Sequence, residues 1–199
     1  DKIFINSLIN KMTVEDKVGQ IVQGDLDFVT PRDLERYRLG SVLNGGNTSP
    51  NKNQYASADQ WKELSKDFYE ASPSVDGVKI PFIWGTDAVH GHNNLIGATI
   101  FPHNIGLGAT RNPELMKLIG SAVALEVLST GVVWTFAPAL SVPRNDRWGR
   151  TYEGFAEEPE LVGQLGSAFV KGLQGEGDEF LDENHILATS KHFAGDGGT

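Results

Sequence analysis

Apolar residues recur along much of this chain at intervals of three or four, the spacing that places them on one face of a helix. Residues 14–22 follow this pattern after Thr13, and Asp16 stands where the carboxylate of a capping box would. Each of the other segments with this helical spacing begins with a capping residue or with a proline in its first turn. The pattern therefore predicts five helices, at residues 14–22 and 31–39 and after Ser57, Asn112 and Glu158.

Four short, nearly continuous apolar runs lie between these helices, at residues 41–44, 80–84, 132–136 and 186–190. Such runs are typical of strands covered on both faces, and alternation of strands with helices implies parallel pairing. Both a (β/α)8 barrel and a doubly wound sheet fit this order. Polar residues follow three of the four strands, as Asn44, Asp87 and the Lys191-His192 pair, and this favours the barrel. The Gly-x-Gly-x-x-Gly turn typical of dinucleotide-binding folds is missing.

Composition and charge narrow the class of protein. The 199 residues are 39% hydrophobic and 22% charged, which is ordinary for a globular domain. The formal net charge of -9 argues against nucleic acid and membrane surfaces as partners, because both bind basic patches. No run approaches the roughly 18 apolar residues of a membrane-spanning helix. The sequence has no cysteine, which excludes thiolate metal sites, and we predict neither a cofactor nor a metal.

Three stretches carry candidate chemistry. Asp87 follows the strand at 80–84, where a carboxylate can accept hydrogen bonds from two neighbouring sugar hydroxyls or simply cap the next turn. Residues 143–153 bring together three arginines, two carboxyl groups and two aromatic rings, a set that suits a polyhydroxylated ligand or a surface loop tied by ion pairs. Lys191 and His192 end an apolar strand, where two basic groups either bind a ligand or form a structural ion pair.

Taken together and in this order, these stretches resemble glycoside hydrolase family 3. The likeness extends over nearly the whole chain, including residues 11–17, 40–43 and 98–110, and is greatest to exo-acting β-glucosidases and β-glucan glucohydrolases. The motifs that carry it are Asp87-Ala88-Val89-His90-Gly91, Arg147-Trp148-Gly149-Arg150 and Lys191-His192-Phe193.

The resemblance implies a retaining β-glucosidase or exo-β-glucanase that releases terminal non-reducing β-D-glucosyl residues. It assigns glucosyl binding to Asp87, Arg150, Lys191 and His192. It gives His90 a supporting role and places the loop of Gly45, Gly46 and Asn47 at the pocket rim. Family members that act on N-acetylglucosamine usually carry a histidine where this chain has Gly195-Asp196-Gly197, so plain β-glucosides are the expected substrates.

The resemblance also implies a (β/α)8 barrel followed by an α/β sandwich domain, of which residues 1–199 would be the first half of the barrel. Family members take the nucleophile from an aspartate on a later strand and the acid/base from further along the chain. We therefore assign no catalytic residue within residues 1–199 and expect the isolated chain to be inactive. The glycine-rich end at residues 195–199 reads as a loop between two elements, which is the expectation for a truncated chain.

Two other functions remain open. His90-Gly91-His92 has the spacing of a metal-binding pair, as in amidohydrolase-type barrels, although further ligands are missing. Alternatively, the chain is a non-catalytic fragment that binds sugar. The predicted partner in the main hypothesis is a β-glucoside or β-glucan oligosaccharide, and a polymeric substrate favours a periplasmic or secreted location.

Overall fold

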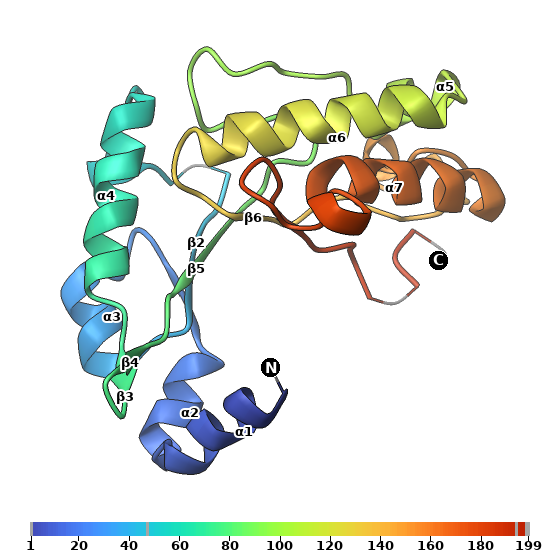
Figure 1. Ribbon diagram of the computed structural model, residues 1–199. Helices are drawn as coiled ribbons and strands as arrows, with labels where there is room; N and C mark the ends of the chain where they lie inside the picture. Colours follow the sequence, from blue (N-terminus) through green and yellow to red (C-terminus); the bar gives the residue numbers. More distant parts are fainter. Residues whose placement is uncertain (1, 47, 194, 198–199) are drawn as a thin grey trace.

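A computed structural model describes residues 2–46, 48–193 and 195–197. At its centre lies a sheet of five parallel strands in the spatial order β1-β2-β5-β6-β7. One or more helices separate each strand from the next along the chain, so the arrangement is a partial TIM-barrel-like domain (Figure 1). The strands are β1 (Gln23–Asp25), β2 (Ser41–Asn44), β5 (Ile83–Thr86), β6 (Trp134–Thr135) and β7 (Leu187–Ala188).

The prediction of a β/α barrel is confirmed, but the prediction of only four strands is wrong. The fifth strand, β1, has the sequence Gln-Gly-Asp and therefore lacks the apolar run by which the other strands were found. Its backbone pairs with β2, with Gln23 opposite Ser41. Three of the four predicted strands are also shorter or displaced, because β5 begins at Ile83 and β6 and β7 are two residues long.

The five predicted helices are present, and in four of them the residue before the predicted start caps the helix with its side chain. Capping boxes start α2 (Val14–Gln20), α3 (Pro31–Tyr37) and α4 (Ala58–Glu70), and the Asn112 side chain accepts a hydrogen bond at the start of α6 (Pro113–Leu128). The fifth is α7 (Pro159–Gln174). Elements that the apolar pattern missed are α1 (Lys2–Lys11), α5 (Asn104–Ala109), the hairpin β3 (Ser74–Val75) and β4 (Val78–Lys79), and the short turns η1 (Pro50–Lys52), η2 (Thr151–Glu153) and η3 (Gly177–Glu179).

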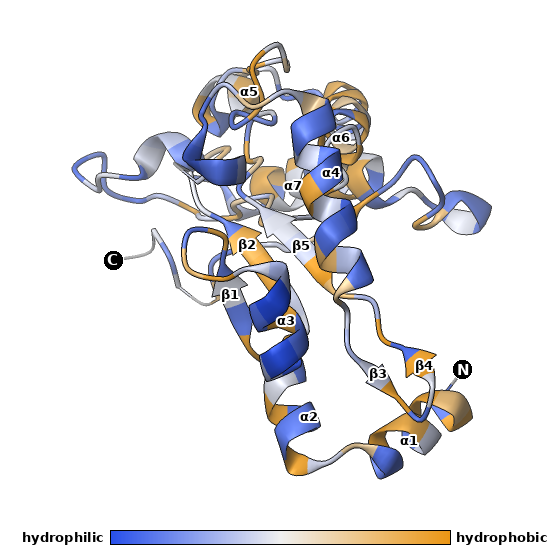
Figure 2. Cartoon of the chain, turned by 90° about the vertical axis from the view of Figure 1, so that its left-hand side faces the viewer, coloured by the Kyte–Doolittle hydropathy of each residue, from blue (hydrophilic) through white to orange (hydrophobic). Residues whose placement is uncertain are grey.

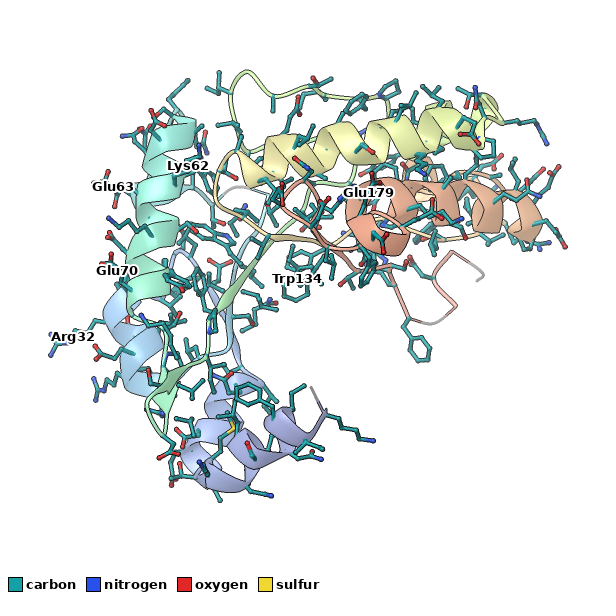
Figure 3. All side chains as sticks on the ribbon, in the orientation of Figure 1. Arg32, Lys62, Glu63, Glu70, Trp134 and Glu179 are labelled. Carbon is teal, nitrogen blue, oxygen red and sulfur yellow. The ribbon has the colours of Figure 1, made fainter. Side chains whose placement is uncertain are left out.

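The core lies between the sheet and its outer helices. Helices α6 and α7 lie side by side (Figure 1), and a Cβ atom at Gly120 or Gly172 would overlap the backbone of the facing helix. This close contact encloses the buried side chains of Met116, Leu165 and Phe169. Charged side chains such as Arg32, Glu63 and Glu70 project away from the sheet (Figure 3).

The apolar face predicted for residues 14–22 does not contribute to this core. Val14, Val18 and Val22 are 71%, 53% and 42% exposed, and hydrophobic side chains of α1 are exposed as well. Both helices lie at the end of the molecule opposite α5 and α6 (Figure 2). Along the described ranges of the chain, no helix is long and apolar enough to cross a membrane.

Candidate glycosyl-binding site

The site lies where β5, β6 and β7 end. These three strands are neighbours in the parallel sheet, so the residues that follow them meet at one edge. Asp87 directly follows β5, and Lys191 pairs with Ala139 in an isolated bridge just beyond β6 and β7. The Nζ atom of Lys191 lies 2.6 Å from Oδ1 of Asp87, although 104 residues separate them. The Lys191 side chain is 15% exposed and that of Asp87 is 41% exposed, so solvent reaches the carboxylate.

Arg150 is held by a carboxylate of its own loop. Its Nε and Nη2 atoms each lie 2.7 Å from an oxygen of Glu153, which is the two-point geometry of an arginine–carboxylate pair. The hydrogen bond from Arg150 lowers the pKa of Glu153, and partial burial opposes this shift without cancelling it. Asn104 donates a hydrogen bond of 2.8 Å to the Glu153 carbonyl and fixes this turn to α5. The guanidinium therefore has a defined orientation before any ligand binds.

His192 lies between Arg150 and a second carboxylate. Its Nε2 atom is 3.3 Å from Nη2 of Arg150, and its Nδ1 atom is 2.7 Å from Oδ2 of Asp196. Ser141 donates a hydrogen bond of 2.5 Å to the same Asp196 oxygen. Burial tends to raise the pKa of Asp196, but the hydrogen bonds from Ser141 and His192 outweigh it and the pKa lies below its usual value.

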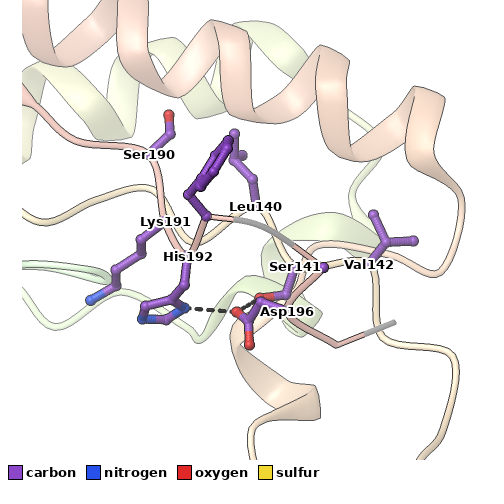
Figure 4. A pocket seen from close by; sticks show the side chains of 9 residues that line it. Leu140, Ser141, Val142, Ser190, Lys191, His192 and Asp196 are labelled. Carbon is purple, nitrogen blue, oxygen red and sulfur yellow. Dashed lines mark hydrogen bonds and ion pairs between the residues drawn. The ribbon is translucent and has the colours of Figure 1, made fainter. Parts of the chain in front are cut away.

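A cavity of about 350 Å³ is lined by Lys191 and His192, but by neither Asp87 nor Arg150. Leu140, Val142 and Phe193 give it apolar walls, while Lys191, His192 and Asp196 supply polar ones (Figure 4). The combination of apolar surface with a few polar groups of fixed orientation is typical of small-ligand sites. The structure thus brings together all four residues predicted to bind a glucosyl unit, Asp87, Arg150, Lys191 and His192.

His90, which was predicted to support the site, lies beside the four predicted sugar-binding residues rather than among them. The Nδ1 atom of His90 is 2.8 Å from the carbonyl oxygen of Phe101, and its ring stacks 4.0 Å from that of His103. His103 in turn contacts the ring of Tyr152, which belongs to the turn that carries Glu153. Burial, with a smaller effect of His90, lowers the pKa of His103. His90 therefore packs against His103, which itself packs against the turn that carries Glu153.

The loop of Gly45 and Gly46, predicted to form the pocket rim, lies at a different cavity from the one lined by Lys191 and His192. Gly46 lines a polar cavity of about 200 Å³ together with Ser49, Asn93 and Asn94, and none of the four predicted sugar-binding residues contributes to it. A Cβ atom at Gly45 or Gly46 would have no atom outside its own chain neighbours within 4 Å. Asn47, the third residue of that predicted rim, lies outside the described residues.

Asn44 and His92 have structural roles. Asn44 is buried and bonded to Trp84 and Thr86, although it stands at the end of a strand. His92 is buried against the edge of Trp61, with Nε2 3.1 Å from the Thr130 hydroxyl. Burial lowers its pKa to about 4. In the described part of the chain, no group of three or more histidine or carboxylate side chains is placed to hold a metal ion.

Sequence reasoning missed the residues that hold Arg150 and His192 in place. Glu153 stands three residues after Arg150 in a tight turn and Asp196 four residues after His192, spacings that allow direct contact. These sequence intervals could have predicted both contacts. Ser141 had no such signal in the sequence, because it reaches Asp196 from a loop 55 residues away.

Comparisons with known proteins place the chain in a family. The model of the glycosyl hydrolase family 3 N terminal domain matches residues 13–199. The lysosomal beta glucosidase of Dictyostelium discoideum is 32% identical over 213 residues, covering 96% of this chain and 26% of the relative. The periplasmic beta-glucosidase of Salmonella typhimurium is 31% identical over 193 residues, covering 96% of this chain and 23% of the relative.

A solved structure agrees closely with the fold. The exo-1,3/1,4-beta-glucanase of a Pseudoalteromonas species superposes with a TM-score of 0.95 and 48% identity over 100% of this chain and 25% of the glucanase chain. The chain spans about a quarter of the length of these relatives. Because the family model covers nearly all of it, the chain belongs to glycosyl hydrolase family 3.

Proposed function

We propose that this chain supplies the glucosyl-binding part of a retaining, exo-acting β-glucosidase or exo-β-glucanase. The observation that carries the proposal is the convergence of Asp87, Arg150, Lys191 and His192 at the ends of neighbouring strands. A carboxylate accepts hydrogen bonds, and an ammonium and a guanidinium donate them, so together they complement hydroxyl groups that do both. The names of the relatives, a glucanase and two beta-glucosidases, support a β-glucosyl substrate.

In this proposal the four residues orient the sugar and do not break the bond. Retention of configuration needs two carboxyl groups about 5–5.5 Å apart, one as nucleophile and one as acid/base. Glu153 and Asp196 are committed to Arg150 and to His192 with Ser141, which supports no such role for them. We assign both catalytic groups to parts of the enzyme outside residues 1–199. Holding the ring hydroxyls would fix the anomeric carbon against that nucleophile and lower the entropic part of the barrier.

The same proposal covers domain organisation and location. Five strands of a parallel sheet are consistent with residues 1–199 as the N-terminal portion of one (β/α)8 barrel, which typically has eight strands and about 250 residues. The remaining strands and a following α/β sandwich domain would complete the enzyme. An extracytoplasmic location suits a polymeric substrate, and the lysosomal and periplasmic names of two relatives support it.

The experiment that tests this function uses the full-length protein. We expect it to hydrolyse p-nitrophenyl β-D-glucoside faster than the xyloside or the N-acetylglucosaminide and to release only glucose from β-1,3- and β-1,4-linked oligosaccharides. NMR of the first product should show β-glucose before mutarotation. Asp87→Ala should lower kcat/KM on the aryl glucoside on the order of 100-fold or more, because it removes an acceptor for substrate hydroxyls.

Other outcomes would change the proposal. A first product with the α configuration would contradict retention, and unchanged kcat/KM in Asp87→Ala would contradict the sugar-binding role. A full-length protein that binds glucose by calorimetry but hydrolyses no β-glycoside would support the non-catalytic alternative.

A further inference from the structure

The hydrogen-bond partners of His192 define where its proton lies. Its Nδ1 atom faces the Asp196 carboxylate at 2.7 Å, and a carboxylate only accepts hydrogen bonds. Its Nε2 atom faces Nη2 of Arg150 at 3.3 Å, and a guanidinium only donates. Both contacts are satisfied together only when Nδ1 carries the proton and Nε2 presents its lone pair. Nε2 is therefore the accepting atom of the His192 ring, and its one lone pair faces Arg150.

Asp196 is itself held in place from two sides. The Ser141 hydroxyl, on a residue only 3% exposed, donates to the oxygen that contacts His192. The next residue, Gly197, has a positive φ of 77° and accepts a backbone hydrogen bond of 3.1 Å from Arg144. A side chain at Gly197 would press against Trp148 and Ser141, so the turn fits only with glycine. The loop that carries Arg150 thus also fixes the carboxylate behind His192.

We propose that Asp196, held by Ser141, is a positioning residue that makes Nε2 of His192 the acceptor for one substrate hydroxyl. This inference rests on the proposed glycosidase function. Nε2 has one lone pair, so the hydroxyl takes the place of Arg150 at that atom: it donates a hydrogen bond to Nε2, and its oxygen accepts the hydrogen bond that Nη2 of Arg150 otherwise directs at Nε2. The geometry thus points to a ligand group that both donates and accepts at this position, which an ether or a fluorine cannot do.

The chain contains a matched control for this arrangement. Asp182 lies 2.6 Å from Nδ1 of His185, which reproduces the aspartate–histidine contact beyond the end of α7. Neither residue lines the cavity at Lys191 and His192. Asp182→Ala removes the same kind of contact without touching the proposed site.

The test uses the full-length protein as wild type, Asp196→Ala, Ser141→Ala and Asp182→Ala. We expect Asp196→Ala to lower kcat/KM on an aryl β-glucoside on the order of 10- to 100-fold, as outer residues that orient a functional histidine do. Ser141→Ala should show a smaller loss and Asp182→Ala less than a twofold change. With aryl glucosides that lack one hydroxyl in turn, the loss caused by Asp196→Ala should nearly disappear for one of them.

A second measurement does not depend on activity. Long-range ¹H–¹⁵N NMR of the wild-type protein, with the His192 signals identified by their loss in His192→Gln, should show the proton on Nδ1. A proton on Nε2, or an Asp196→Ala loss that is equal for every deoxy substrate, overturns the inference. If wild type hydrolyses no β-glycoside, the proposed function fails, whereas the NMR result still decides the tautomer.

Discussion

Two polar networks lie next to each other at the ends of the central strands, and they differ in charge and in access to solvent. In the first, the Trp84 indole donates to Asn44, and Asn44 donates to Thr86, over distances of 2.8 and 2.9 Å. All three residues are at most 1% exposed. In the second, Lys191, Arg150 and His192 contact Asp87, Glu153 and Asp196, and the basic side chains remain partly open to solvent.

The difference separates a structural network from the network that we propose binds sugar. Neutral groups that are buried and bonded to each other stabilise the fold, and a missing partner there costs free energy of unfolding. Charged groups at a cavity keep hydrogen-bonding capacity for a ligand while their partners fix their orientation. Asn44 is the last residue of its strand and Asp87 directly follows one, so the sequence pattern does not distinguish their roles. In the structure, Asn44 is in the first network and Asp87 is in the second.

The largest expected effect comes from the second network, which we propose binds sugar. Lys191→Met removes a hydrogen-bond donor and leaves Asp87 without its 2.6 Å contact, so kcat/KM of the full-length protein on an aryl β-glucoside should fall by on the order of 10²- to 10⁴-fold. Lys117→Met is the control, because Lys117 pairs with Glu176 at 2.8 Å on the outer surface and lies in neither network. If both variants retain wild-type kcat/KM, Lys191 does not bind substrate.

The next effect is on stability and comes from the buried network. Asn44→Ala leaves the Trp84 indole N–H and the Thr86 hydroxyl without their partner, and each unpaired buried group costs about 1–3 kcal/mol. For the two groups together, we therefore expect the free energy of unfolding to fall by about 2–6 kcal/mol. Urea denaturation measures this, with Asn184→Ala, at an exposed turn, as the control. Equal midpoints for the two variants would contradict a structural role for Asn44.

A smaller effect, with a pH signature, comes from Glu153→Gln. The neutral amide holds Arg150 less firmly. KM should therefore rise by roughly tenfold, which corresponds to the free energy of about one hydrogen bond to a charged group. Because the pKa of Glu153 is lowered from 4.5, its ionised form stabilises the fold above that value, and this contribution is lost as the pH falls through the lowered pKa. The stability difference between wild type and Glu153→Gln should therefore be present at neutral pH and vanish in acid.

Glu158→Gln serves as its control, since Glu158 pairs with Arg111 at 3.4 Å on an exposed surface. Exposed pairs of this kind contribute little to stability. A Glu153→Gln variant whose stability and KM follow those of Glu158→Gln at every pH would show that Glu153 does not orient Arg150.

Local signals predicted the helices well and the strands less well. Thr13, Thr30 and Ser57 mark helix starts because a capping side chain bonds to backbone groups only three residues away. β1 was missed because a three-residue strand of Gln-Gly-Asp owes its place to pairing with β2 rather than to its own side chains. The apolar positions of α2 correctly predicted a helix, but their side chains do not face the core of residues 1–199.

By itself, the sequence determined the alternation of helices and strands, the family likeness and the four residues proposed to bind sugar. These depend on periodicity, on capping and on short motifs, all of which act within a few residues. Only the tertiary structure decided that Lys191 pairs with Asp87 across 104 residues and that Ser141 reaches Asp196 across 55. Such contacts depend on which strands become neighbours in the sheet, and that is settled by packing over the whole domain rather than by any one segment.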